Sequence, residues 1–284
     1  MRLPAKLFNI VSGLALLVAC PAGLAAQDRS MTLPTSTGET KVEIWDAVGD
    51  APKGVILFGT GWRGNPDGYD ALLTRLASAG YAVFAPVTLD SAQHPGHGTV
   101  DADTMAGAQA FIGDRMMATL SLRGWLAETY PETPMVLAGH SFGSFVSLTN
   151  AEGRWAFGPL TGPPVAAVLA FSSPGEVPQL VGEASYSTLD LPMMMITGTE
   201  DGGSGTFPTW EAHRLAFDRS VAGDKYLVVF EGGDHALAHD SGEEWLPRAA
   251  TMGETFLDAY VAKNAESRAL METLEASNVR IERR

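Results

Sequence analysis

The sequence has a single cysteine, Cys20, among its 284 residues. Cys20 lies in an N-terminal segment that we expect to be processed, so the domain that follows it can form no internal disulfide and offers no cysteine nucleophile. No apolar run reaches the ~18 residues that a membrane-spanning helix needs. No segment repeats at intervals of about 20–50 residues, which excludes solenoid folds.

Positive charge is also scarce. Lys and Arg number 19 against 33 Asp and Glu, and the net charge is −14. Such a surface repels nucleic acid and anionic lipid, so we expect neither as a partner. The solubility of an exported protein is enough to explain this charge.

The N-terminus has the pattern of a secretory signal. Arg2 and Lys6 precede an apolar run over residues 7–19, which small residues follow. Cleavage after residue 25 or 26 would release a soluble periplasmic or secreted protein, which is the form we expect. The alternative is a lipid anchor on Cys20, because residues 17–20 (L-V-A-C) resemble a bacterial lipobox.

These features divide the chain into three parts. We predict a signal peptide at 1–26, one domain at 27–263 and a charged, peripheral C-terminal tail at 264–284, which could be helical up to about residue 276. The segments at 152–164 and 175–190 are too short for a large lid. We therefore expect a minimal lid and an open site.

Within the domain, apolar runs that predict strands alternate with segments of helical spacing. The expected strands are 41–48, 53–58, 81–86, 134–138, 165–171, 193–197 and 225–230. The expected helices are 69–79, 105–130, the segment after residue 143, 210–221 and 247–263. This alternation predicts an α/β fold with a mostly parallel sheet and helices on both faces. The strand at 41–48 alternates polar and apolar residues, so we expect it at an edge.

A serine at a sharp turn marks the centre of the expected site. Residues 139–143 read Gly-His-Ser-Phe-Gly and connect the strand at 134–138 to a helical segment. This is the G-x-S-x-G nucleophile elbow in the strand–turn–helix context that it requires. The serine needs a strained backbone conformation, and glycines two residues before and after it avoid a clash with neighbouring backbone. We predict Ser141 as a nucleophile.

A serine hydroxyl needs a base, which is typically a histidine oriented by a carboxylate. His235 directly follows the last strand and is the predicted base, with His239 as the alternative. His140 adjoins the serine, but the sharp turn should point the two side chains apart. His213 lies inside an expected helix.

The orienting acid is expected on the loop after the strand at 193–197. Asp201 is the preferred acid, because the chain order Ser, Asp, His then follows the elbow pattern. Glu200 is the alternative on the same loop. Asp234 neighbours the predicted base in sequence and is expected to shape that loop instead.

The negative charge that forms on attack needs preorganised N–H donors. Phe142 begins the helix after the serine, where early N–H groups have no intrahelical partner. The second donor should come from the loop after the strand at 53–58, where Gly59-Thr60-Gly61 lets the backbone approach closely. Trp62 N–H is the predicted donor, and its indole ring could line a pocket.

In this order and spacing, these segments resemble the α/β-hydrolase superfamily. Residues 67–69, 77–83 and 225–235 look like those of predicted dienelactone hydrolases and platelet-activating-factor acetylhydrolase-like serine esterases. The resemblance covers roughly residues 40–262 and implies a serine esterase that acts on carboxylic esters through an acyl-enzyme. Because no large lid is expected, small or short-chain esters are the expected substrates, and the mechanism needs no cofactor or metal.

Two features depart from that family. Thr60-Gly61 stands where the family usually has His-Gly, which leaves the backbone donor available but changes the loop. Dienelactone hydrolases proper use a cysteine nucleophile, and the processed chain has none. That specific activity is therefore not expected.

Other interpretations stay open at this point. The glycines at 59, 61 and 64, followed by Asp90, weakly match a dinucleotide-binding fingerprint, although an export signal leads to a compartment where such cofactors are scarce. A non-catalytic binding protein on the same fold is a further alternative. An acyltransferase is another, because an alcohol can intercept an acyl-enzyme in place of water.

One polar loop carries residues that could gather a metal ion. His94 and His97 precede Asp101 and Asp103 on it. A solvated loop over the entrance of the site explains the same residues, and we prefer that interpretation.

Overall fold

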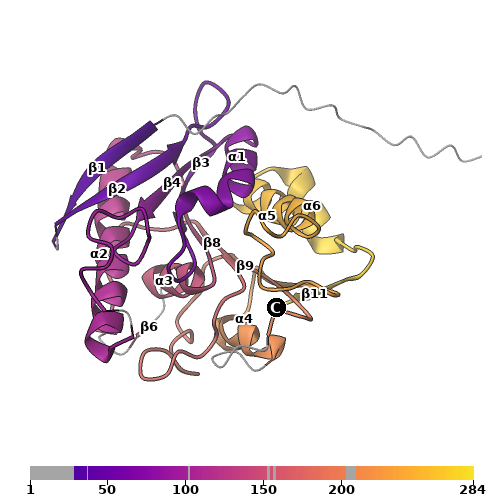
Figure 1. Cartoon of the computed structure of the whole chain (residues 1–284). Helices are drawn as coiled ribbons and strands as arrows, with labels where there is room; N and C mark the ends of the chain where they lie inside the picture. Colours follow the sequence, from indigo (N-terminus) through magenta and orange to yellow (C-terminus); the bar gives the residue numbers. More distant parts are fainter. Residues whose placement is uncertain (1–28, 37, 102, 152–153, 156–157, 203–208) are drawn as a thin grey trace, which may run out of the picture.

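The structure is a computed structural model that describes residues 29–284 except 37, 102, 152–153, 156–157 and 203–208 (Figure 1). The signal peptide expected at 1–26 and the alternative anchor Cys20 lie outside the described residues. In the part of the chain that is described, no helix combines the length and apolar character that crossing a membrane requires.

One sheet, formed by nine of the strands within the described residues, organises the molecule. Its order is β1-β2-β4-β3-β5-β8-β9-β10-β11. The strands are β1 (Arg29–Thr35), β2 (Gly38–Trp45), β3 (Gly54–Gly59), β4 (Tyr81–Val87), β5 (Met135–His140), β8 (Ala167–Phe171), β9 (Met193–Gly198), β10 (Lys225–Phe230) and β11 (Val279–Arg283). The strands from β4 to β10 run parallel, while β1, β2 and β11 are antiparallel to their neighbours. The predicted mostly parallel sheet is therefore confirmed.

Helices cover both faces of this sheet (Figure 1). One face carries α1 (Asp70–Ser78), α5 (Leu246–Tyr260) and α6 (Ala265–Thr273), and the other carries α2 (Met105–Thr129), α3 (Phe142–Ala151) and α4 (Leu215–Arg219). The short helices η1 (Pro66–Tyr69) and η2 (Trp210–Arg214) and the hairpin of β6 (Arg154–Trp155) and β7 (Gly158–Pro159) complete the elements. Strand β3 shows why its sequence is continuously apolar: Ile56 packs toward α1 and Leu57 toward α2.

Strand β2 is not at the edge of the sheet, where its alternating sequence had been expected. All seven residues of β1 pair with it on its outer side, from Arg29 opposite Ile44 to Thr35 opposite Gly38. Alternation of polar and apolar residues does not report the neighbours of a strand: Lys41 is exposed, but Glu43 on the same face is buried. The pattern identified the strand correctly but not its position.

The C-terminal segment 264–284 is part of the domain, which corrects the expectation of a peripheral tail. Met271 of α6 is buried in the cluster that α1 and α5 form. Strand β11 pairs with β10 from Tyr226 opposite Arg283 to Phe230 opposite Val279. The apolar residues of β11, Val279 and Ile281, pack against the same cluster. The charged residues of this short strand, Arg280, Glu282 and Arg283, made it look like a solvated tail.

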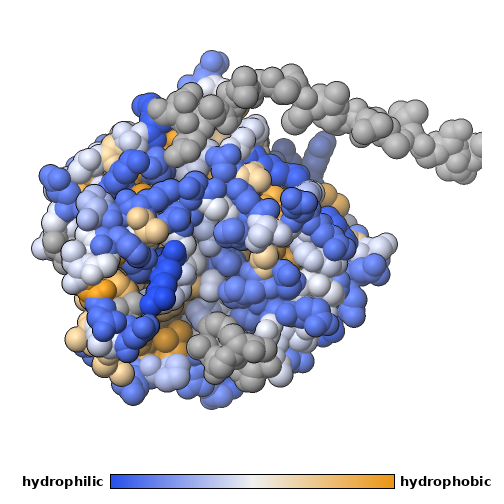
Figure 2. Space-filling model, in the orientation of Figure 1, coloured by the Kyte–Doolittle hydropathy of each residue, from blue (hydrophilic) through white to orange (hydrophobic). Residues whose placement is uncertain are grey.

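Hydrophilic residues cover most of the face shown in Figure 2, and hydrophobic residues form small separate groups on it.

Candidate active site

The predicted site residues lie at the carboxyl ends of parallel strands, where loops of an open α/β sheet form sites. Ser141 follows β5, Asp201 lies three residues after β9, and His235 follows β10 by five residues. The loop after β3 contains Trp62. Segments far apart in the sequence therefore meet at one end of the sheet.

The turn at Ser141 has the strained geometry that the motif predicts. Ser141 has a φ of 52°, in the left-handed region. A Cβ on Gly143 would lie 2.0 Å from the carbonyl oxygen of Gly59, and one on Gly139 would lie 2.5 Å from the carbonyl carbon of Gly143. Both glycines are required because β5, α3 and the end of β3 approach one another too closely for a side chain. The serine side chain therefore stands at the turn, clear of the sheet.

Ser141, His235 and Asp201 form one hydrogen-bonded line. The Ser141 Oγ lies 2.9 Å from His235 Nε2. The His235 Nδ1 lies 2.7 Å from Asp201 Oδ1. The carboxylate accepts the Nδ1–H, so a neutral His235 presents an unprotonated Nε2 to the serine hydroxyl. Asp201 is completely buried, whereas the His235 side chain is 46% exposed.

The alternatives weighed from the sequence lie elsewhere. His239 Nδ1 is 2.9 Å from Ser241 Oγ, and its ring packs against Tyr69. Asp234 accepts a hydrogen bond from the backbone N–H of Ala236, as expected for a residue that shapes its own loop. Glu200 contributes backbone contacts to Gly233 and Gly202.

A second histidine, His213, contacts the same carboxylate. Its Nε2 lies 3.1 Å from Asp201 Oδ1 and 2.8 Å from the Asp201 carbonyl oxygen. Its Nδ1 faces the carbonyl oxygen of Ser173. Both ring nitrogens thus face acceptors, an arrangement that favours the doubly protonated, positively charged ring. Nothing in the sequence signalled this contact, because His213 lies on η2, a different element from the Asp201 loop.

Burial and charge act in opposite directions on this pair. Burial alone would raise the pKa of Asp201, but hydrogen bonds from His213 and His235 outweigh it and hold the pKa well below its usual range. Burial alone would lower the pKa of His213, but the hydrogen bond and charge of Asp201 raise the pKa above its ordinary value. Thr197 Oγ1 donates to the other carboxylate oxygen at 2.7 Å. Asp201 is therefore ionised and held on both oxygens.

His140 has a different role from His235 despite its place beside Ser141. Its Nε2 donates to the carbonyl oxygen of His235 at 2.7 Å, because a carbonyl can only accept. Its Nδ1 therefore accepts from the Tyr69 hydroxyl, 2.9 Å away. The Tyr69 oxygen in turn accepts the Gly61 N–H at 2.9 Å. Burial lowers the pKa of His140 to about 3, so it stays neutral and links the two loops that flank Ser141.

The two expected oxyanion donors lie beside the serine. Phe142 N–H is the first of α3, and neither it nor Trp62 N–H has a hydrogen-bond acceptor among the residues described. The rings of Trp62 and Phe142 pack edge to face with centroids 5.0 Å apart. A Cβ on Gly61 would lie 3.6 Å from the Ser141 Cβ, so the loop that carries Trp62 passes next to the serine.

An apolar pocket of about 360 Å³ opens at Ser141. Its other lining residues are Trp62, Ala108, Ile112, Phe142, Pro174 and Val177. Among the residues that the structure describes, no ionisable side chain lines it. Its volume is at the lower end of the range of about 300–1,000 Å³ for ligand pockets.

Metal ligands are close enough to share an ion at one place in the described chain, among Asp201, His213 and His235. Their ligand atoms lie within 4.8 Å of one another but are hydrogen-bonded to each other and to the serine. On the polar loop considered from the sequence, two of the candidate ligands have other partners. His94 Nδ1 accepts from the Gly96 N–H, and Asp103 forms an ion pair with Arg63. An ion on Asp201 would break the line to Ser141.

Comparison with known proteins finds likeness in structure. No family model matches the chain, and no curated protein matches it. The thermophilic esterase Est2 from Thermogutta terrifontis superposes with a TM-score of 0.61 at 16% identity, over 82% of this chain and 92% of that one. The esterase domain of a Rhodothermus marinus protein has a TM-score of 0.57 at 16% identity, over 82% of this chain and 98% of the domain.

A third solved structure, TT1662 from Thermus thermophilus, has a TM-score of 0.55 at 21% identity, over 82% of this chain and 98% of that one. Likeness at such identities shows the fold. Together with the sheet order and the helices on both faces, it establishes that the chain has the α/β-hydrolase fold that the sequence predicted.

Proposed function

We propose that this protein is a serine hydrolase that cleaves carboxylic esters through an acyl-enzyme. The observation that carries the proposal is the hydrogen-bonded line from Asp201 through His235 to Ser141, which ends at an apolar pocket. The names of two similar structures support it, since both are esterases and one Est2 structure has propionate bound.

In the first half of the reaction, His235 Nε2 takes the proton of the Ser141 hydroxyl as Oγ attacks the ester carbonyl carbon. The carbonyl oxygen becomes an oxyanion, which the N–H groups of Phe142 and Trp62 bind. Asp201 keeps the His235 tautomer and stabilises the imidazolium. The tetrahedral intermediate then expels the alcohol, which receives the proton from His235.

In the second half, water attacks the acyl-enzyme. His235 takes a proton from the water as its oxygen bonds to the acyl carbon, and the same N–H groups bind the oxyanion again. Collapse breaks the bond to Oγ, and His235 returns the proton to Ser141. The products are a carboxylic acid and the free enzyme, and each step uses groups of the chain and water.

The pocket indicates the class of acyl group. Because its walls are apolar and uncharged, it favours a neutral hydrocarbon acyl chain over a charged one. Its volume of about 360 Å³ suits small or short-chain esters. The long apolar chain of a palmitate ester would extend beyond it.

The test is hydrolysis of p-nitrophenyl esters from acetate to palmitate by the wild type and by Ser141→Ala. We expect turnover that peaks at short chains and is lost in the variant. Equal background rates for both proteins, with no labelling of Ser141 by a fluorophosphonate, would favour a binding protein. Ester formation when a short alcohol is added in excess would indicate an acyltransferase.

We also propose that the protein is exported, on the basis of the charge and apolar pattern of residues 1–26. A soluble periplasmic or secreted form is preferred over a form anchored at Cys20. Intact mass of the processed protein distinguishes them, with Cys20→Ser as the control. A lipid mass that disappears in that variant would replace the soluble form by the anchored one.

A further inference from the structure

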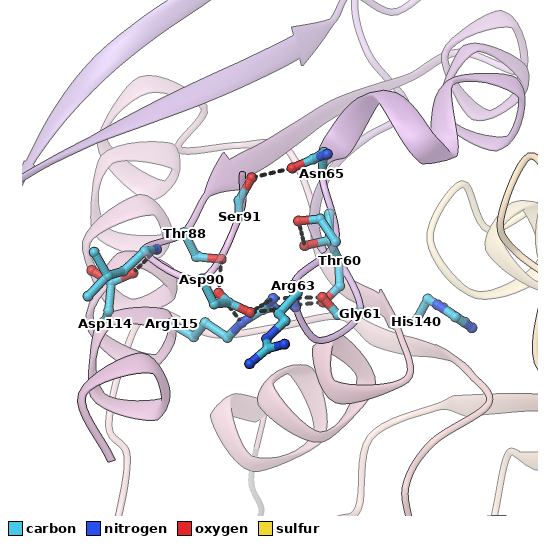
Figure 3. A network of polar contacts seen from close by, with 12 residues as sticks. Thr60, Gly61, Arg63, Asn65, Thr88, Asp90, Ser91, Asp114, Arg115 and His140 are labelled. Carbon is cyan, nitrogen blue, oxygen red and sulfur yellow. Dashed lines mark hydrogen bonds and ion pairs between the residues drawn. The ribbon is translucent and has the colours of Figure 1, made fainter. Parts of the chain in front are cut away.

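Arg115 is a buried arginine that contacts the backbone of the loop after β3. It projects from α2 and is 2% exposed. Its Nη1 donates to the carbonyl oxygen of Thr60 and its Nη2 to that of Gly61, both at 2.7 Å (Figure 3). The guanidinium therefore holds two successive carbonyl groups immediately before Trp62.

Asp90 completes this arrangement and holds the loop on the other side of Trp62. Its carboxylate accepts from Arg115 Nε at 3.0 Å and from Nη2 at 2.7 Å. It also accepts the backbone N–H of Arg63 at 2.7 Å and the Thr88 hydroxyl at 2.9 Å. Arg63 has a φ of 58°, so this N–H contact holds a turn that a non-glycine residue rarely adopts. The weak match of Asp90 to a nucleotide-binding acid is thus explained by a buried ion pair.

Because the peptide bond is planar, the hydrogen bonds to the Gly61 carbonyl also set the direction of the Trp62 N–H. The Gly61 carbonyl and the Trp62 N–H belong to one planar trans peptide, so they point in opposite directions. Because the guanidinium fixes the direction of the Gly61 carbonyl, it also fixes the direction of the Trp62 N–H, which points away from Arg115. Its positive charge polarises the peptide and strengthens the N–H as a donor. From the opposite side, the Gly61 N–H is held by Tyr69 at 2.9 Å.

We propose that Arg115, held by Asp90, is a positioning residue that aims the Trp62 N–H at the oxyanion formed on attack by Ser141. This inference rests on the proposed esterase function. The competing view is that the ion pair only stabilises the fold. The two views differ in what is lost when Arg115 is replaced: a positioning residue affects turnover, whereas a structural residue affects stability alone.

The experiment compares three variants with the wild type on a short p-nitrophenyl ester. Arg115→Met removes the charge and the donors, and Arg115→Lys keeps the charge without the fork that contacts two carbonyls and a carboxylate. The control is Arg75→Met on α1, because Arg75 also donates to a carboxylate, that of Glu254, and to a carbonyl, that of Pro247, both on α5. All four proteins are measured for kcat, KM and Tm.

We expect kcat of Arg115→Met to fall about 10²-fold with KM within about threefold, since removal of one oxyanion donor costs about 10²–10³ in kcat. Arg115→Lys should fall less. Arg75→Met should lower Tm with kcat unchanged. A folded Arg115→Met that retains wild-type kcat would overturn the proposal, as would a fall of kcat in Arg75→Met equal to that in Arg115→Met.

A second measurement does not depend on esterase activity. The backbone ¹⁵N–¹H resonance of Trp62 reports on the hydrogen bond to the preceding carbonyl. We expect this resonance to shift or broaden in Arg115→Met and to stay in place in Arg75→Met. If the wild type shows no turnover that depends on Ser141, the proposed function is wrong. The resonance still decides whether Arg115 orients the peptide between Gly61 and Trp62. An unmoved resonance would refute the positioning role in either case.

Discussion

The two sides of Ser141 are built from different kinds of groups. On one side, His235 and Asp201 present side chains, and hydrogen bonds to those side chains orient them. On the other side, the loop of Trp62 presents a backbone N–H, and the contacts that hold it are made to carbonyl and N–H groups of the neighbouring backbone. The first side is linked to the second through His140 and Tyr69.

This difference explains why one side could be read from the sequence and the other only in part. A reactive side chain is visible as a residue type at a strand end. A backbone donor can belong to any residue type, and its direction is set by a distant side chain such as Arg115. Mutations should therefore act directly on the first side and through neighbours on the second.

The largest effect is expected from substitutions in the hydrogen-bonded line of Ser141, His235 and Asp201. Ser141→Ala and His235→Ala should each lower kcat about 10⁴–10⁶-fold, and the double variant should lose little more, because these groups act as one unit. Single-turnover kinetics on a p-nitrophenyl ester measures this. If the losses of kcat in the two single variants added up in the double variant, the prediction would be wrong, since the two side chains would then act independently.

The acid is expected to come next. Asp201→Asn should lower kcat about 10⁴-fold, because an amide in place of the carboxylate favours the wrong His235 tautomer. Glu200→Gln is the matched control on the same loop and should stay within about twofold. Similar losses in both variants would contradict the assignment of Asp201.

A smaller effect is expected at the pocket. Ala108→Trp places a large ring in it and should lower kcat/KM for butyrate about tenfold or more while acetate changes little, since one methylene in a hydrophobic pocket is worth about 10–200-fold. Ala110→Trp, on the same helix but outside this pocket, should leave the ratio unchanged. The ratio of kcat/KM values for the two esters is the measurement. An unaltered ratio in Ala108→Trp would place the acyl chain elsewhere.

The smallest expected effect is on stability. The pKa of His213 is raised above 6.5, so its ion pair with Asp201 contributes fully below that pH and is lost as the pH rises through the raised value. His213→Gln should lower the free energy of unfolding by about 1–3 kcal/mol at pH 5.5. This difference should shrink at alkaline pH.

Urea unfolding of both proteins from pH 5 to 9 measures the difference, with His97→Gln on the exposed loop as the control. If the difference between wild type and His213→Gln were independent of pH, His213 would not be the charged partner that the geometry requires.

Much of the fold followed from local pattern. The strand at 225–230 coincides with β10, and the long helix at 105–130 with α2 to within one residue. The errors concern position: β2 lies inside the sheet, and the end of the segment 264–284 forms the edge strand β11 of that sheet. Periodicity reports which face of an element is buried, but the neighbour on each side is chosen by packing between segments that are distant in the chain.

By itself, the sequence determined the α/β alternation, the strained serine with its two glycines, and the strand-end positions of Asp201 and His235. These features depend on residue type and on the immediate neighbours in the chain, so a short stretch of sequence is enough to identify them. Only the tertiary structure decided that His213 shares Asp201, that His140 links two loops, and that Arg115 fixes the peptide before Trp62. Each of these contacts joins groups from different elements, and the close approach of those elements is a property of the packed sheet and helices.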